Sequence, residues 1–322
     1  MGEPSSKTGW WAWSTKKKAL IFGTVALVII GLGVGLGVGL GIGLKNGGDD
    51  DNGDGNEGSG SGSNTTTPTN TTVKWQPAVG TKWQIILKTQ NNEPISTSVD
   101  APIYDIDLFD NNKTVISDLQ KMGRKVICYF SAGSFEDWRD DAGDFDAADK
   151  GKDLDGWPGE KWLNVKSANV RKIMQARLDI AVAKGCDGVD PDNIDGYDNP
   201  NGLDLTKAEA IDYVNWLASQ SHSRGLSVGL KNGAGIIDSV IDKMQWCVNE
   251  QCAQFQECDT YASFIGADKP VFHIEYPKGD DTNNNKSVTT SQANSACTAN
   301  SSGNFSTVIK NMDLDNWVEY CP

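Results

Sequence analysis

The chain has 322 residues, which is enough for one large domain or two small ones, and its formal net charge is −14 at pH 7. Residues 1–74 hold six Lys and six Asp or Glu, so the whole net charge belongs to the part that begins near Trp75. Such an acidic field repels nucleic acids and anionic polysaccharides and concentrates polycationic ligands. We therefore expect no nucleic-acid partner.

The first predicted element is a membrane-spanning helix over residues 19–44. This run carries no charge. At ~1.5 Å per residue it would form a helix of ~39 Å, longer than the ~30 Å hydrocarbon core of a bilayer. It is also longer than the apolar region of a cleaved signal peptide, which has about 7–15 residues. Lys16, Lys17 and Lys18 precede the run and acidic residues follow it, which places residues 1–18 in the cytoplasm. The sequence thus predicts a single-pass type II protein of the cell membrane with an extracellular domain.

Residues 45–74 form the next predicted segment, a flexible stalk. They are mainly Gly, Asp, Asn, Ser and Thr, so they have almost nothing to bury that would offset the entropy of ordering. Sequons of the form Asn-x-Ser/Thr occur only after the apolar run. They predict glycosylation at Asn64, Asn70, Asn112, Asn285, Asn300 and Asn304.

The seven cysteines all lie beyond residue 127, which is typical of a domain in an oxidising compartment. We expect the disulfides Cys252–Cys258 and Cys297–Cys321, because these residues lie in or beside predicted loops. The other three cysteines lie in strand-like runs. Because the total is odd, at least one of them is expected to be a buried free thiol.

From Trp75 onward, short apolar runs alternate with helical patterns, which indicates βα units and a parallel sheet. The predicted strands are Trp83–Lys88, Pro102–Phe109, Lys125–Ser131, Gly188–Pro191, Leu226–Lys231, Trp246–Asn249, Pro270–Glu275 and Thr307–Asn311. The predicted helices include Val115–Met122, Val170–Lys184, Lys207–Ser223 and Ile236–Met244. Eight units over residues 75–322 match the size of a (β/α)8 TIM-type barrel. The competing open, doubly wound sheet lacks a glycine-rich phosphate loop after an early strand.

Carboxylates gather at the predicted strand ends, where the site of such a barrel lies. A single one is readily explained as a helix cap, but several acids aimed into one rim repel each other unless function or a cationic ligand requires them. Alternation points Asp105 and Asp107 to the same side of the second strand. Hydrolysis of a glycosidic bond needs two carboxyl groups. Asp192 and Glu250, at the ends of two other strands, are the preferred pair.

Alternatives to this pair remain open. Asp190 and Asp195 could replace Asp192, although Asp190 could instead point into the barrel and Asp195 belongs to the outgoing loop. Glu275 is the main alternative to Glu250. The chain has only two histidines, His222 and His273, so neither a zinc cluster nor a His-based triad can be assembled. We expect no metal and no cofactor.

Aromatic side chains near strand ends are candidates for contact with sugar rings. Tyr129, Tyr197 and Tyr276 are the three that we place beside the substrate. Most other aromatic side chains, a group that includes Trp138 and Trp157, are expected to pack between elements.

Three segments of the chain resemble glycoside hydrolase family 114, and the likeness extends over about Trp75 to Pro322. They are the run Gly185–Asn193 followed by Asp195 and Tyr197, the run Tyr104–Asp107, and Asn249–Glu250 followed by Cys252. The fungal endo-α-1,4-polygalactosaminidases of that family are the most similar. The resemblance implies endo-hydrolysis of galactosaminogalactan in its deacetylated α-1,4-galactosamine stretches. The implied substrate fits the acidic domain, because free amines make that polysaccharide cationic.

Carried over to this chain, the resemblance places the catalytic pair on Asp192 as nucleophile and Glu250 as acid/base, with net retention. The implied sugar subsites are lined by Asp105, Asp107, Asp190, Asn193, Lys231 and Glu275. Lys231 then requires a carboxylate neighbour, because it is a second cation in a site for a cationic sugar. Two other functions stay open: hydrolysis of another α-galactose-type polysaccharide, and polysaccharide binding at the cell surface without turnover.

Overall fold

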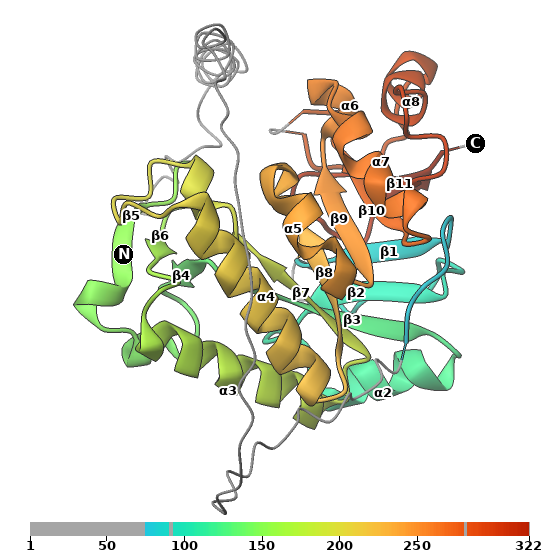
Figure 1. The fold of residues 1–322 in the computed structure, drawn as a ribbon. Helices are drawn as coiled ribbons and strands as arrows, with labels where there is room; N and C mark the ends of the chain where they lie inside the picture. The colour runs from blue at the N-terminus through green and yellow to red at the C-terminus, as the bar shows by residue number, and fades with distance from the viewer. Residues whose placement is uncertain (1–74, 90–92, 280–281, 322) are drawn as a thin grey trace, which may run out of the picture. The chain divides into compact units, whose positions relative to one another are not determined.

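The computed structural model describes residues 75–89, 93–279 and 282–321. Its main feature is a nine-stranded sheet in the order β1-β2-β3-β7-β8-β9-β10-β11-β12 (Figure 1). The first eight of these strands run parallel to one another wherever they pair. They are β1 Trp83–Ile86, β2 Ile103–Asp107, β3 Lys125–Ser131, β7 Gly188–Asp192, β8 Ser227–Lys231, β9 Trp246–Glu250, β10 Val271–Glu275 and β11 Ser306–Lys310.

The two ends of this sheet come together, so that the barrel is nearly closed. The short strand β12 (Val318–Tyr320) pairs antiparallel with β11. The Trp83 indole on β1 donates to the Ser306 carbonyl on β11 at 2.7 Å. The Tyr320 hydroxyl on β12 donates to the Trp83 carbonyl at 2.8 Å. The predicted TIM-type barrel is thus confirmed, and all eight predicted strands are found with ends shifted by at most a few residues.

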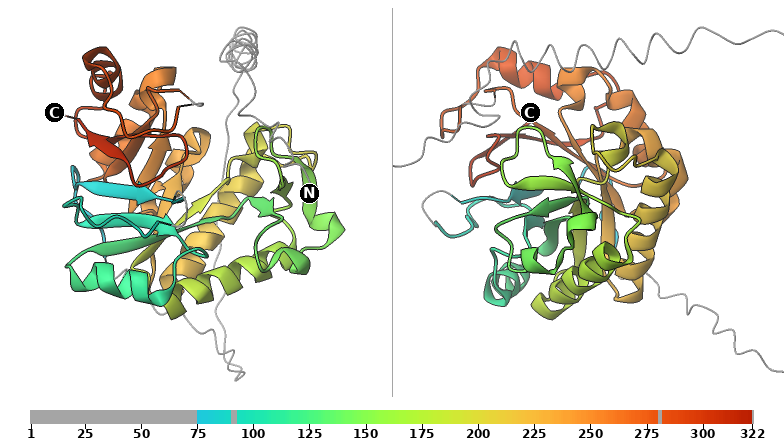
Figure 2. Two further views of the ribbon diagram at one scale, coloured as in Figure 1. Left: turned by 180° about the vertical axis from the view of Figure 1, so that it is seen from behind. Right: turned by 90° about the vertical axis from the view of Figure 1, so that its left-hand side faces the viewer.

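Helices surround the sheet on its outer face (Figures 1 and 2). Their bounds are α2 Lys113–Lys121, α3 Ala168–Lys184, α4 Lys207–Ser223, α5 Ile237–Val240, α6 Cys252–Phe255, α7 Cys258–Gly266 and α8 Thr290–Cys297. The long helices begin and end where local chemistry requires. The Ser167 side chain caps α3, Gly185 in the left-handed region ends it, and Thr206 with Glu209 forms a capping box on α4.

The alternation of side chains along the strands produces two apolar cores. One fills the barrel and includes Trp83, Ile127, Val248 and Phe272. The other, larger one lies between the strands and the helices. Successive residues of a strand therefore point alternately into the barrel and toward the helices.

A second, three-stranded sheet was not predicted. It consists of β4 (Ser134–Glu136), β5 (Lys150–Asp153) and β6 (Glu160–Leu163), with β6 in the middle. We call residues 134–163 the β4–β6 lobe. The lobe follows the carboxyl end of β3, and Figure 1 shows it beside the barrel. Its sequence is rich in Asp and Gly, which are depleted in strands, so that no apolar run signals it.

The disulfides agree with the two predicted pairs and add a third. Cys252–Cys258 and Cys297–Cys321 are bonded, and so is Cys128–Cys186. Cys247 is the buried free thiol. The third bond joins β3 to the segment before β7, two neighbouring strands of the barrel.

No helix in the described part of the chain is long and apolar enough to cross a membrane. The predicted cytoplasmic tail, membrane span and stalk, together with the sequons at Asn64 and Asn70, lie outside the described residues. The other four predicted glycosylation sites, Asn112, Asn285, Asn300 and Asn304, are all exposed.

Candidate active site

Asp192 and Glu250 meet at the mouth of the barrel through a shared lysine. Asp192 ends β7, Glu250 ends β9, and Lys231 ends the strand between them. The Lys231 Nζ lies 3.1 Å from Asp192 Oδ2 and 2.9 Å from Glu250 Oε2. The lysine is 2% exposed, whereas the two carboxylates are 16% and 25% exposed. The predicted need of Lys231 for a carboxylate neighbour is met twice.

The shared contact limits the separation of the two carboxyl groups. Two oxygens that lie 3.1 and 2.9 Å from one nitrogen can be no more than about 6 Å apart, the sum of the two distances. Glycosidases that retain configuration hold their carboxyl groups ~5–5.5 Å apart, and inverting ones ~6.5–9.5 Å apart. The two oxygens that contact Lys231 are therefore closer together than the carboxyl groups of inverting enzymes.

Each carboxylate has its own tyrosine donor. The Tyr129 hydroxyl donates to Asp192 Oδ2 at 3.0 Å, and the Tyr276 hydroxyl donates to Glu250 Oε1 at 2.5 Å. Burial, with the neighbouring carboxylates, raises the pKa of both tyrosines well above the usual value, so they act as donors. Both were predicted to lie beside the substrate, and both lie beside the acid pair.

Glu250 is held as an anion. Burial alone would raise its pKa, but Lys231 and the hydrogen bonds from Tyr276, Lys231 and Asn232 outweigh burial and lower the pKa. The Asn232 side-chain amide donates to Glu250 Oε2 at 3.1 Å. The Oδ1 of the same side chain accepts from the Glu250 backbone N–H at 3.0 Å. Sequence reasoning did not select Asn232, although its place directly after Lys231 was a usable signal.

Two further predicted acids lie beneath the pair, inside the barrel. Asp105 and Asp190 are both fully buried, and none of their four carboxyl oxygens meets a donor among the described residues. Burial raises the pKa of both groups, and for Asp105 the nearby Asp190 adds to the effect. A proton on Asp105, donated to Asp190, would give each group one hydrogen bond. Neither acid is placed to touch a sugar, so the predicted subsite role and the alternative of Asp190 for Asp192 lose their geometric basis.

Asn193 connects Asp192 to the β4–β6 lobe. Its backbone N–H donates to Asp192 Oδ1 at 2.7 Å, and its side chain donates to the hydroxyls of Ser131 and Ser134. The Ser134 hydroxyl donates in turn to Glu160 Oε2 at 2.6 Å. Burial, with the charges of Glu136 and Asp192, raises the pKa of Glu160 to about 8. Glu160 was not a predicted site residue, because it lies in the sheet that the sequence did not reveal.

Asp195 and Tyr197 lie on the loop that leaves β7. Burial, followed by repulsion from Asp192, raises the pKa of Asp195 to about 6. Burial and the neighbouring acids raise the pKa of Tyr197 to about 12. Asp195 thus lies near Asp192, whereas the Tyr197 hydroxyl lies beside Gly235.

Asp107 departs from its prediction as a sugar ligand. The Arg139 guanidinium donates to both of its carboxylate oxygens, at 2.7 and 3.2 Å. One of these oxygens also accepts from the backbone of Phe109 and Asp110. Arg139 further contacts Glu136, at 2.9 Å. The predicted alternation is correct, but Asp107 is almost fully buried and fastens the β4–β6 lobe to the end of β2.

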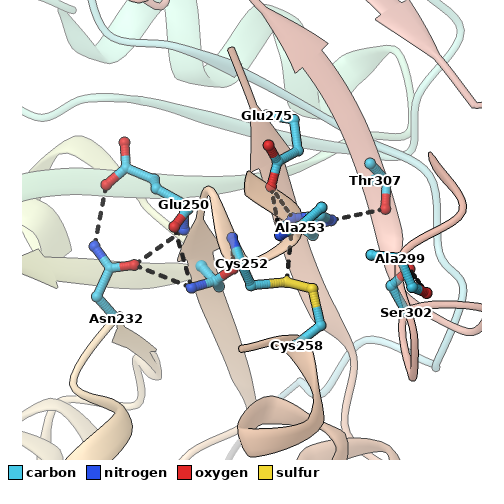
Figure 3. Close-up of a disulfide and its surroundings, with 11 residues drawn as sticks. Asn232, Glu250, Cys252, Ala253, Cys258, Glu275, Ala299, Ser302 and Thr307 are labelled. Carbon is cyan, nitrogen blue, oxygen red and sulfur yellow. Dashed lines mark hydrogen bonds and ion pairs between the residues drawn. A yellow bond between two sulfur atoms is a disulfide. The ribbon is translucent and has the colours of Figure 1, made fainter. Parts of the chain in front are cut away.

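Glu275 also departs from its prediction, both as a subsite residue and as the alternative to Glu250. It is 4% exposed, and its Oε1 accepts from His273 Nε2 at 2.9 Å and from the Ala253 backbone at 2.8 Å. Figure 3 shows that Glu250 and Glu275 belong to separate hydrogen-bonded groups of residues, with Cys252 between the two groups. Glu275 thus holds the first turn of α6 on the helix side of the sheet.

One group of potential metal ligands occurs in the described part of the chain. Ligand atoms of Cys252, Cys258 and His273 lie within 4.8 Å of one another. The two sulfur atoms are bonded to each other, so they offer no thiolate to a metal ion. The group is therefore a disulfide packed against an imidazole.

The fold and the site together define a class of protein. A TIM-type barrel with two carboxyl groups facing each other at the carboxyl ends of its strands is the arrangement of a glycoside hydrolase. The family model of glycoside-hydrolase family GH114 matches residues 64–322. The chain belongs to this family and is a glycoside hydrolase.

Solved structures agree with this assignment. The structure of Aspergillus fumigatus Ega3 in complex with galactosamine is 68% identical in sequence, covers 78% of this chain and 98% of its own, and has a TM-score of 0.75. The glycoside hydrolase domain of PelA from Pseudomonas aeruginosa is 12% identical, covers 72% of this chain and 95% of its own, and has a TM-score of 0.57, a likeness of fold alone. Among curated proteins, no relative matches the chain.

Proposed function

We propose that this enzyme cleaves α-1,4-galactosamine linkages inside deacetylated galactosaminogalactan. The observation that carries the proposal is the pair of Asp192 and Glu250 facing each other across Lys231. The 68% sequence identity to a protein whose crystal structure contains galactosamine supports the proposal. The net charge of −14 adds a field that attracts a polymer of free amines.

In the proposed reaction Asp192 is the nucleophile and Glu250 the acid/base. Asp192 attacks the anomeric carbon, and the bond to the leaving oxygen breaks as Glu250 gives that oxygen a proton. Glu250 then takes a proton from water, the water oxygen attacks the same carbon, and Asp192 leaves, so that the configuration is retained. Contacts with Tyr129, Lys231 and the Asn193 backbone suit Asp192 to carry negative charge before and after the attack.

Lys231 sets a condition on this assignment. In the free enzyme the ammonium and the neighbouring donors keep the pKa of Glu250 low despite burial, which favours a carboxylate and not the acid that the first step needs. We therefore propose that the bound sugar breaks the ion pair of Lys231 with Glu250. Glu250 then takes up a proton, while the ion pair of Lys231 with Asp192 is kept. We propose the nearby Asp195 as the acid that contacts the amine of the substrate.

We also propose that the enzyme works outside the cell, held by residues 19–44 and carrying glycans on its stalk and domain. Three disulfides in the barrel domain are what an oxidising compartment allows. The four described sequons are exposed, so an oligosaccharide can reach each asparagine.

The test is product analysis of the full-length protein on α-1,4-galactosamine oligomers, with the anomeric configuration of fresh products followed by NMR. We expect internal cleavage and α-configured products. Equal cleavage of fully acetylated polymer would show that the amine is not recognised. Binding of the polymer without any product would show a surface lectin in place of an enzyme.

A further inference from the structure

Two tryptophans of the β4–β6 lobe are exposed against expectation. Trp138 is 53% and Trp157 is 47% exposed. Every other tryptophan in the described part of the chain is buried or half-buried. A large indole left in water loses the stabilisation of burial, which makes an exposed pair on one small lobe a candidate for ligand contact.

The two indoles come from turns that touch each other. The Asp137 backbone N–H donates to the Gly159 carbonyl at 3.1 Å, directly beside Trp138 and two residues from Trp157. Gly159 has a φ of +95°, a backbone conformation that favours glycine, and this conformation brings its carbonyl to the Asp137 backbone. The two turns therefore form one surface.

This surface is fastened to the rim of the barrel at two points. Next to Trp138, the Arg139 guanidinium is buried between Asp107, at the end of β2, and Glu136. Three residues from Trp157, Glu160 connects through Ser134 to Asn193, the residue after Asp192. Three residues of chain span at most ~11 Å, so Trp157 lies within that distance of Glu160, whose side chain begins the hydrogen-bonded path through Ser134 and Asn193 to Asp192.

The lobe also carries the charge that suits a cationic polymer. Residues 134–163 contain ten Asp or Glu and four Lys or Arg, a net charge of −6. Its exposed acids are Asp137, Asp140, Asp144, Asp146, Asp153 and Asp155. Aromatic faces attract ammonium groups as well as apolar ring faces, so indoles among carboxylates suit amino sugars twice over.

We propose that Trp138 and Trp157 form a stacking platform for sugars of the galactosamine polymer that lie beyond the two at the scissile bond. The inference rests on the proposed function, because it assigns the polymer that the platform binds. Its role is to hold long chains over Asp192 and Glu250, and the platform takes no part in bond cleavage. Short oligomers that fill only the acid pair do not reach it.

The experiment compares Trp138→Ala, Trp157→Ala and the double variant with the wild type on galactosamine chains of increasing length. Because both side chains are exposed, we expect the thermal midpoint to be unchanged. We expect the KM for long polymer to rise about tenfold in the double variant at constant kcat. Short oligomers should be cut as by the wild type. Met122→Ala is the matched control, because Met122 is equally exposed but follows α2 at the opposite end of the barrel.

The outcomes separate this inference from the proposed function. If the wild type cuts polymer and the double variant keeps the wild-type KM at every chain length, the platform is wrong and the function stands. If the wild type cuts no galactosamine polymer, the function itself is wrong. The double variant Trp138→Phe with Trp157→Phe keeps two aromatic faces. Its KM for long chains should therefore be close to that of the wild type and well below that of the double alanine variant.

Discussion

Glu250 and Glu275 end neighbouring strands of one sheet, yet they serve different sides of it. In the pairing of β9 with β10, Glu250 lies opposite Ile274. Residues in register point to the same face, so Glu275, one residue later, points to the other face. Glu250 enters the mouth of the barrel, and Glu275 enters the layer between the sheet and its helices.

The surroundings of the two glutamates differ accordingly. Glu250 is a quarter exposed and contacts an ammonium, a phenol and an amide. Glu275 is almost fully buried and accepts from a neighbouring imidazole and from the backbone at the start of α6. The comparison teaches that a carboxylate at a strand end is no evidence of a site until its face is known. We call these two groups the mouth side and the helix side.

The largest effect that separates the two sides is on turnover. Glu250→Gln keeps the shape of the side chain but cannot transfer the proton, so kcat should fall at least ~1000-fold. Glu275→Gln keeps an acceptor for His273 and Ala253 and should leave kcat within ~10-fold, with the loss appearing in the thermal midpoint. Both are measured by initial rates on galactosamine oligomers and by thermal unfolding.

Asp192→Asn is the positive control on the mouth side and should match Glu250→Gln. A Glu275→Gln variant that is fully folded and as inactive as Glu250→Gln would contradict the division into two sides.

A smaller effect is expected from the disulfide that lies on the helix side. Cys252–Cys258 closes a short loop directly after Glu250, and Cys252 Sγ lies 3.3 Å from His273 Nε2. Replacing both cysteines with alanine should lower the free energy of unfolding by about 2 kcal/mol. The Asn249 side chain, which accepts from the Cys252 backbone at 3.2 Å, still holds the turn. The variant should therefore keep wild-type kcat below its lowered midpoint.

The measurement is denaturant unfolding beside kinetics at a temperature at which the double variant is folded. A fall of kcat by more than ~10-fold in the folded variant would mean that the helix side positions Glu250, and the two sides would no longer be separate.

The barrel could be predicted because its information is local. Each parallel strand is buried on both faces and appears as a short apolar run with turn residues around it, and the long helices carry their caps in sequence. The acid pair followed from the same pattern, because both residues end strands. The two predicted disulfides were also found, because their cysteines lie in or beside predicted loops.

What could not be predicted depends on contacts between distant segments. The β4–β6 lobe has polar strands that are fastened to the barrel by the contact of Arg139 with Asp107, and by Ser134, which Glu160 and Asn193 share. Glu275 was misplaced because its face depends on a one-residue register. Trp138 and Trp157 were expected in packing, because no local pattern distinguishes an exposed indole from a buried one.

The smallest effect concerns the roles within the mouth side and uses its two tyrosines as a matched pair. Tyr276→Phe removes a donor that lowers the pKa of Glu250, so that pKa should rise. If Glu250 gives a proton, activity falls as Glu250 ionises, and the alkaline limb of the kcat/KM profile should move to higher pH. Tyr129→Phe removes the equivalent donor from Asp192 and should leave that limb in place. A shift of the acidic limb in Tyr276→Phe would mean that Glu250 must be ionised to act, and the nucleophile and the acid/base would then have to be exchanged.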